Sequence, residues 1–169
     1  ASRGQTVVVL AQEGVVVGLL AIADQLRASS PAAVRRLQDM GVKVMMLTGD
    51  NPATAASVAS HVGLADYRAE VKPGDKARIV QELVAAGRKV AMAGDGVNDA
   101  PALAAADVGF AMGAGSDVAI ETAGVTLMKS DLMAVADAID LSRHTMKKIR
   151  QNLFFAFVYN VLGIPLAVV

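Results

Sequence analysis

From residue 31 onward, short apolar runs typical of β-strands alternate with segments of helical periodicity, and glycine or proline marks most of the boundaries. The expected strands are residues 42–47, 67–71, 89–93, 108–112 and 125–128, and the expected helices are 31–40, 52–61, 76–86 and 116–122. Alternation of this kind predicts βαβ units. We therefore expect an α/β fold with a parallel sheet and helices on both of its faces.

The two ends of the chain depart from this alternation. Residues 6–10 and 15–20 are β-branched runs separated by the turn sequence AQEG, which is a hairpin signature. Residues 131–150 have the pattern of a long amphipathic helix that continues into the apolar end of the chain. The length of 169 residues suits one domain of ordinary size between these ends.

The last 17 residues, LFFAFVYNVLGIPLAVV, carry no charged side chain. As a helix they would span roughly 25 Å, against about 30 Å of bilayer hydrocarbon. Five basic residues precede them: Arg143, His144, Lys147, Lys148 and Arg150. A basic cluster of this kind is typical of the cytoplasmic side of a membrane helix. We interpret residues 143–169 as a juxtamembrane segment and the start of a membrane helix; the alternative is a buried C-terminal helix.

Charge and cysteine content exclude several classes of function. Lys plus Arg equals Asp plus Glu at 16 each, so no excess of positive charge points to nucleic acid. The chain has no cysteine, which excludes disulfides and thiolate metal ligands within it. It begins at Ala1, with neither a Met nor a signal peptide, and we interpret it as part of a longer protein.

The chemistry is concentrated in the run AGDGVNDAP, residues 93–101, directly after an expected strand. Asp95, Asn98 and Asp99 lie within five residues there, at the strand end where open α/β folds bind their ligands. Carboxylates together with phosphate oxygens are the ligands that Mg²⁺ usually takes. We predict that Asp95 binds magnesium, that Asp99 binds or orients it, and that Asn98 donates to a phosphoryl group; a solvated loop is the alternative.

Two more polar clusters follow other strands. Thr48, Gly49 and Asp50 end one strand, and Lys76 opens a helix after a Pro-Gly-Asp turn. A threonine hydroxyl and backbone amides at a helix N-terminus suit a phosphate, and a lysine neutralises phosphate oxygens. Each cluster alone is typical of an ordinary turn or surface lysine, but the three in this order favour one phosphate site.

These clusters resemble motifs of the P-type cation-transporting ATPases, which belong to the haloacid dehalogenase superfamily. The similarity includes MLTGDN (46–51), PGDK (73–76) and GDGVNDAPAL (94–103). It implies a haloacid dehalogenase-like, Rossmann-like fold and transfer of a phosphoryl group from ATP to an aspartate, assisted by magnesium. Asp24 and Arg27 resemble the family's Asp-x-x-Arg hinge, which implies a part in nucleotide binding. The order implied is the end of a nucleotide domain (1–20), the second part of a phosphorylation domain (21–142) and the membrane segment.

The heavy-metal subgroup, and its copper(I) branch in particular, is the most similar. Residues 112–121 and 151–154 are similar to its sequences, and Tyr159-Asn160 resembles a pair proposed for its transport site. Oxygen donors suit soft copper(I) poorly without sulfur ligands, and Tyr159 is alternatively a helix-packing residue. Copper(I) and silver(I) both fit this resemblance.

One motif of the family lies outside the sequence. The nucleophilic aspartate of Asp-Lys-Thr-Gly-Thr is absent, so we expect this chain alone to be inactive and to work with the rest of one multi-pass membrane protein, in which this domain is cytoplasmic. The alternatives are a soluble phosphatase of the same superfamily and a truncated, non-catalytic regulatory paralogue.

Overall fold

A computed structural model describes residues 6–22, 26–94, 97–113 and 117–168 of the chain. The chain divides into two compact units, residues 1–135 and 136–169. In chain order the elements are β1 (Thr6–Gln12), β2 (Val15–Ile22), α1 (Ser30–Asp39), β3 (Met45–Leu47), α2 (Pro52–Val62), β4 (Asp66–Arg68), α3 (Pro73–Ala85), β5 (Ala91–Gly94), the 3₁₀ turn η1 (Val97–Asp99), α4 (Ala100–Ala105), β6 (Val108–Met112), α5 (Asp117–Thr122), β7 (Val125–Leu127) and α6 (Leu132–Val168).

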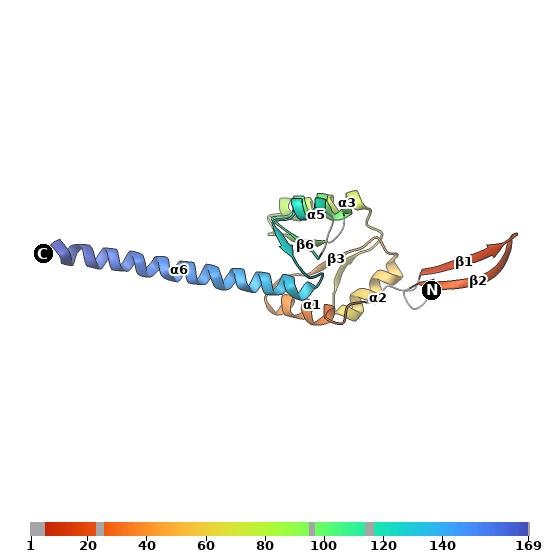
Figure 1. The fold of residues 1–169 in the computed structure, drawn as a ribbon, viewed down its shortest axis with the longest axis horizontal. Helices are drawn as coiled ribbons and strands as arrows, with labels where there is room; N and C mark the ends of the chain where they lie inside the picture. Colours follow the sequence, from red (N-terminus) through yellow and green to blue (C-terminus); the bar gives the residue numbers. More distant parts are fainter. Residues whose placement is uncertain (1–5, 23–25, 95–96, 114–116, 169) are drawn as a thin grey trace. The chain divides into compact units, whose positions relative to one another are not determined.

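The strands of the first unit form parallel sheets with helices on both sides, as the sequence predicts. Strand β3 pairs with β4, and β5, β6 and β7 pair in that order, all in parallel. In Figure 1, α3 and α5 lie on one side of these strands, and α1 and α2 lie on the other. Within the described residues, no backbone ladder joins the β3–β4 sheet to the β5–β6–β7 sheet.

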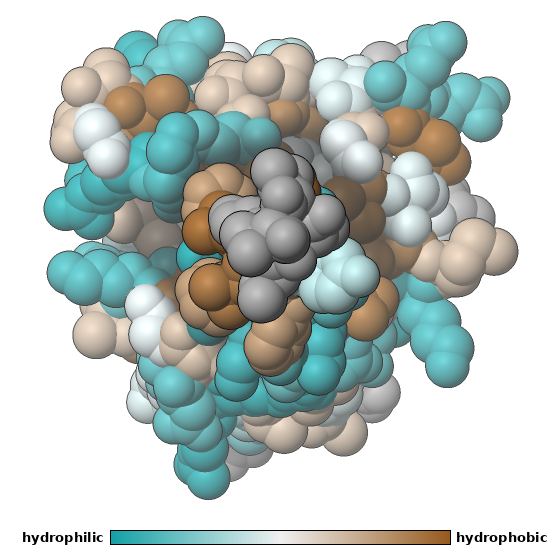
Figure 2. Space-filling model, turned by 90° about the vertical axis from the view of Figure 1, so that its left-hand side faces the viewer, coloured by the Kyte–Doolittle hydropathy of each residue, from teal (hydrophilic) through white to brown (hydrophobic). Residues whose placement is uncertain are grey.

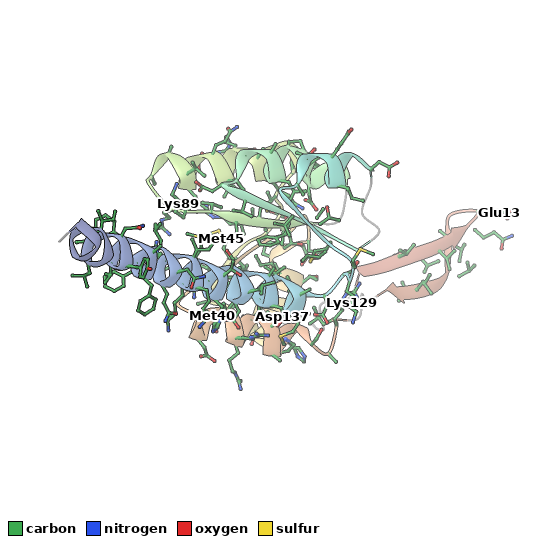
Figure 3. The ribbon with its side chains drawn as sticks, turned by 60° about the vertical axis from the view of Figure 1, so that its left-hand side comes forward. Glu13, Met40, Met45, Lys89, Lys129 and Asp137 are labelled. Atoms are coloured by element: carbon green, nitrogen blue, oxygen red, sulfur yellow. The ribbon has the colours of Figure 1, made fainter. Side chains whose placement is uncertain are left out.

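The predicted hairpin is confirmed. Strands β1 and β2 pair antiparallel, with Gln12 opposite Val15, so a two-residue turn joins them. Both turn residues, Glu13 and Gly14, have positive φ, as the tight hairpin turn that matches strand twist requires. Glu13 marks the tip of the hairpin in Figure 3.

Helix ends decide where two elements differ from the prediction. Helix α1 ends in a left-handed Gly41, and the amide of Val42 bonds to the carbonyl of Leu37 in a Schellman motif. Residue 42 therefore belongs to a helix cap, and β3 begins only at Met45. Helix α3 begins at Pro73 instead of Lys76, because proline is favoured in the first turn of a helix. Lys76 consequently lies in the first turn of α3.

The core beneath the carboxyl end of β5 is small and tightly packed. Leu103 and Ala111 are fully buried, and Met92 and Ala123 pack against them. Leu103 belongs to α4, a short helix that the sequence analysis does not predict; the signal for it is Pro101, close to its start. At Gly109 of β6, an added Cβ would lie 3.1 Å from the carbonyl oxygen of Leu103 and 3.3 Å from the Cα of Ala123. Close packing thus leaves no room for a side chain at Gly109.

The long helix predicted from residue 131 is confirmed as α6. Among the residues that the structure describes, no helix is long and apolar enough to cross a membrane.

A carboxylate joins β5 to β6 at the edge where both strands begin. One oxygen of Asp107 lies 2.8 Å from Nζ of Lys89, and the other accepts the amide of Val90 at 2.9 Å. Lys89 lies just before β5 and is labelled in Figure 3. The Lys89 ammonium and the Val90 amide hold the pKa of Asp107 below its ordinary value.

We predict that Gly109→Ala destabilises the domain by about 1–3 kcal/mol, because backbone atoms surround the added methyl and no side-chain rotation can relieve the contact. Gly124→Ala is the matched control, since nothing lies within 4 Å of its added Cβ and its φ is not positive. Urea denaturation of both variants checks this. Equal losses of unfolding free energy would contradict the packing described for β6.

A second prediction concerns acid stability. Because the pKa of Asp107 is lower in the folded chain than in the unfolded chain, the interaction stabilises the fold at neutral pH. That contribution falls away as the pH drops below about 5 and the carboxylate is protonated. The difference in unfolding free energy between the natural chain and Asp107→Asn should therefore shrink from pH 7 towards pH 3. In a Lys89→Gln background the same difference should be smaller at pH 7 and should vary less with pH.

Candidate phosphoryl-binding site

The Thr48 turn follows β3 and is closed by its own side chains. The Thr48 hydroxyl donates to Oδ2 of Asp50 at 2.8 Å and accepts the Asp50 amide at 3.1 Å. Asn51 then caps α2, because its side-chain oxygen accepts the amide of Thr54 at 2.9 Å. The Thr48 hydroxyl and the N-terminus of the eleven-residue helix α2 therefore lie at the same end of β3.

The second part of the site is an ion pair between α3 and the residues after β5. Nζ of Lys76 lies 2.8 Å from Oδ1 of Asp99, and the two side chains are 20% and 13% exposed. Partial burial weakens the screening by water, so this pair is stronger than a fully exposed one. It joins two of the polar clusters that the sequence analysis singles out.

Gly94, the last residue of β5, lets Asp99 occupy its position. A Cβ on Gly94 would lie 2.7 Å from Cβ of Asp99 and 2.8 Å from its Oδ2. No real Cβ tolerates such contacts, so the Asp99 carboxylate is seated directly on the glycine. Gly94 is buried; the predicted motif includes it, but its contact with Asp99 is visible only in the structure.

Backbone bonds connect the Thr48 turn to the Lys76–Asp99 pair. The Val71 amide donates to the Thr48 carbonyl at 2.9 Å, and the Glu70 amide donates to the Asp50 carbonyl at 2.8 Å. Val71 is buried and directly precedes Lys72, the N-cap of α3. The loop that starts α3 is thereby tied to the Thr48 turn, while Lys76 in the first turn of α3 reaches Asp99. The structure thus pairs Lys76 directly with Asp99, and it joins the Thr48 turn to the loop that begins α3.

Several predicted residues remain untested. Asp95 and Asp24 lie outside the described residues, and Asn98 is described as exposed on η1. Among the described residues, no three His, Cys, Asp or Glu side chains group as metal ligands. The Asp99 carboxylate supplies the hard oxygen that Mg²⁺ prefers, and its Oδ2 is not the atom engaged by Lys76. Asp99 alone thus fits the predicted magnesium role among the residues that the structure describes.

The structure also describes three other predicted residues, Arg27, Tyr159 and Asn160. Arg27 is exposed, and its charge acts on Asp131, whose pKa is lowered mainly by the Met133 amide and the Ser29 hydroxyl. Ser29 donates to Asp131 at 3.0 Å, so residues just after the predicted hinge are bonded to the start of α6. Tyr159 and Asn160 are exposed on α6, where Tyr159 retains 78% of its accessible surface.

Comparison with known proteins identifies close relatives. The family model of haloacid dehalogenase-like hydrolases matches residues 1–107. The silver exporting P-type ATPase of Salmonella typhimurium is 56% identical over 98% of this chain and 20% of its own length. The copper-exporting P-type ATPase of Legionella pneumophila is 55% identical over 98% of this chain and 22% of its own length. The chain thus spans about a fifth of these relatives.

A solved structure shares the fold. The zinc-transporting PIB-type ATPase in its E2.Pi state superposes with a TM-score of 0.81 at 42% identity, covering 96% of this chain and 28% of that one. The similarity extends over nearly all of the chain, including the site assembled above.

We predict that Gly94→Ala displaces Asp99 and disrupts its pairing with Lys76. A double-mutant cycle of Lys76→Met and Asp99→Asn should give a coupling of about 1 kcal/mol in the natural chain. In the Gly94→Ala background the coupling should approach zero, because the methyl occupies the seat of the carboxylate. Gly49→Ala is the control, since its added Cβ would meet only the Val71 carbonyl at 3.6 Å, an ordinary contact. A coupling unchanged by Gly94→Ala would refute the proposed seat.

Proposed function

The chain belongs to the haloacid dehalogenase-like hydrolases, and we propose that it is the phosphoryl-handling part of an ATP-driven heavy-metal transporter. The transported ion is proposed to be copper(I) or silver(I), since the relatives named for those ions share more than half of its residues. These relatives are transporters, which favours this function over a soluble phosphatase of the same fold.

One observation carries the proposal: Lys76 and Asp99 meet 2.8 Å apart at the carboxyl end of β5, in an assembly bonded to the Thr48 turn. Parallel α/β sheets bind their ligands at this end of the strands. The assembly combines a lysine, a hydroxyl, a helix N-terminus and a carboxylate. That combination serves a transferring phosphoryl group and its metal ion.

In the proposed mechanism, hydrogen-bond donors and the lysine bind the phosphoryl group, and the carboxylates bind the metal ion. The Gly49 amide donates to a phosphoryl oxygen, and the Thr48 hydroxyl would do so once its single proton turns away from Asp50, to which it donates at 2.8 Å in the structure. Lys76 neutralises charge on the phosphoryl group, and Asn98 donates to it. Asp95 and Asp99 would hold Mg²⁺, which when bound neutralises developing charge on the phosphoryl oxygens. The aspartate that receives the phosphoryl group belongs, in this proposal, to a part of the protein outside this chain.

The remaining sequence predictions belong to the same proposal. Residues 1–20 would end a nucleotide domain, 21–142 would form the second part of the phosphorylation domain, and Asp24 and Arg27 would join the two. Residues 143–169 would begin a membrane helix in which Tyr159 and Asn160 contribute to the ion site, beside sulfur ligands from elsewhere in the protein. The domain itself would then face the cytoplasm.

The test is a chimera in which this chain replaces the matching segment of the Legionella pneumophila exporter. We predict that the chimera forms an acid-stable phosphoenzyme from ATP and Mg²⁺, and that Asp95→Ala abolishes it. Lys76→Met should slow phosphoenzyme formation by about 10²-fold, because it removes one positioned charge from the transfer site. The readout is incorporation of labelled phosphate into chimera purified from membranes.

The matched control is Lys89→Met in the same chimera. Lys89 also pairs with an aspartate at 2.8 Å, but at the opposite edge of the sheet. It should leave the rate of phosphorylation unchanged. Normal phosphorylation of the Asp95→Ala chimera would overturn the magnesium role, and a folded chimera that is never phosphorylated would overturn the proposed function.

A further inference from the structure

Exposed apolar side chains cover more than half of the circumference of α6 between residues 153 and 164. Seven large hydrophobic side chains between residues 153 and 164 are each more than half exposed: Leu153, Phe154, Phe155, Phe157, Val161, Leu162 and Ile164. They lie at successive helix positions and so point in several directions. Figure 2 views the end of this helix, with brown hydrophobic atoms gathered around its tip. A helix with so broad an apolar surface requires apolar surroundings on more than one side.

The segment immediately before it is strongly basic. Four Arg or Lys side chains occur between residues 143 and 150, and no Asp or Glu occurs after Asp140. Arg143, Lys147 and Arg150 are spaced by four and three residues, so they share one face of the helix. Together with Ser142 and Met146 they line a shallow hollow on its surface. The positive charge is therefore concentrated on one side, less than a turn from the first apolar residue.

We propose that this basic face, Arg143, Lys147 and Arg150, binds the headgroups of anionic phospholipids at the membrane surface. The inference rests on the membrane attachment in the proposed function and adds a preference for lipid charge. A protein groove would satisfy the apolar half alone. An anionic bilayer satisfies both halves at once, because its hydrocarbon solvates residues 153–164 while its phosphates face cations one turn away.

The distances along the helix agree with this geometry. Residues 143–150 cover about 10 Å of helix axis, comparable with the depth of a headgroup layer. Their long side chains can extend towards phosphates while their methylene stems lie along apolar surface. His144 is engaged on another face, since its Nδ1 lies 3.0 Å from the Asp140 carbonyl and 3.3 Å from an Asp140 carboxylate oxygen.

The test measures co-sedimentation of the 169-residue chain with two kinds of vesicle, pure phosphatidylcholine and phosphatidylcholine with one third phosphatidylglycerol. The natural chain should bind the anionic vesicles about a hundredfold more tightly, at about 1 kcal/mol for each of the three cations, and raising the salt should remove that preference. Lys147→Gln with Arg150→Gln should weaken binding to the anionic vesicles about twentyfold and leave binding to neutral vesicles nearly unchanged.

The matched control removes two cations from elsewhere. Arg35→Gln with Lys43→Gln makes the same change in net charge at exposed positions of the first unit and should leave both affinities unchanged. Circular dichroism verifies that each variant is folded, and the salt dependence of the natural chain tests the proposal without any variant.

The outcomes separate the inference from the proposed function. Equal binding to both vesicle types, or equal weakening by both double variants, overturns the headgroup preference and leaves the membrane attachment standing. If the chain binds neither kind of vesicle, both the headgroup preference and the membrane attachment are refuted. The same holds if the chain sediments as oligomers formed through α6, without vesicles. The phosphoenzyme test of the chimera does not depend on either result.

Discussion

The seat of Asp99 on Gly94 is the contact on which the candidate site depends. Because β5 ends in a residue without a side chain, the 3₁₀ turn η1 can fold back and place a carboxylate on the strand end. Lys76 then holds that carboxylate from α3, and the Val71 amide ties the loop before α3 to the Thr48 turn. A single methyl at position 94 would displace the Asp99 carboxylate and so disrupt its pairing with Lys76.

The two edges of the β5–β6–β7 sheet show how similar ion pairs serve different ends. Lys76–Asp99 and Lys89–Asp107 have the same 2.8 Å separation. Lys89 is 91% exposed, and its partner also caps the Val90 amide, so that pair stabilises the start of two strands. Lys76 is 20% exposed, beside a loop, a helix N-terminus and a glycine. The surroundings of the Lys76–Asp99 pair, and not its N–O distance, favour a role in ligand binding.

The sequence predicts that Thr48, Lys76 and Asp99 lie at one edge of the sheet, because parallel strands place their carboxyl ends together. The structure shows the pairing of Lys76 with Asp99. Details set by close packing were less accessible. Helix α4 is only six residues long, too short for its periodicity to stand out, and β3 loses its first residues to the cap of α1. The glycines of the motif suggest only that bulk is kept away from its polar side chains, and the specific role of Gly94 is not visible in the sequence. Its role depends on a contact with a residue five positions away, which no local pattern encodes.

Charge balance argues that the assembly is incomplete without a cation. Lys76 and Asp99 neutralise each other, and Asp50 remains beside the Thr48 hydroxyl as a further negative charge. A phosphoryl group adds more negative charge, and Asp95 adds another carboxylate next to the end of β5. The positive groups in the described part of the site are one lysine, backbone amides and a helix N-terminus. The amides and the helix N-terminus each supply only a fraction of a charge. In the proposed function a divalent cation would offset part of the repulsion between the phosphoryl group and these carboxylates. In the proposed function, magnesium would supply positive charge that Lys76 cannot supply alone, since its ammonium is already paired with Asp99.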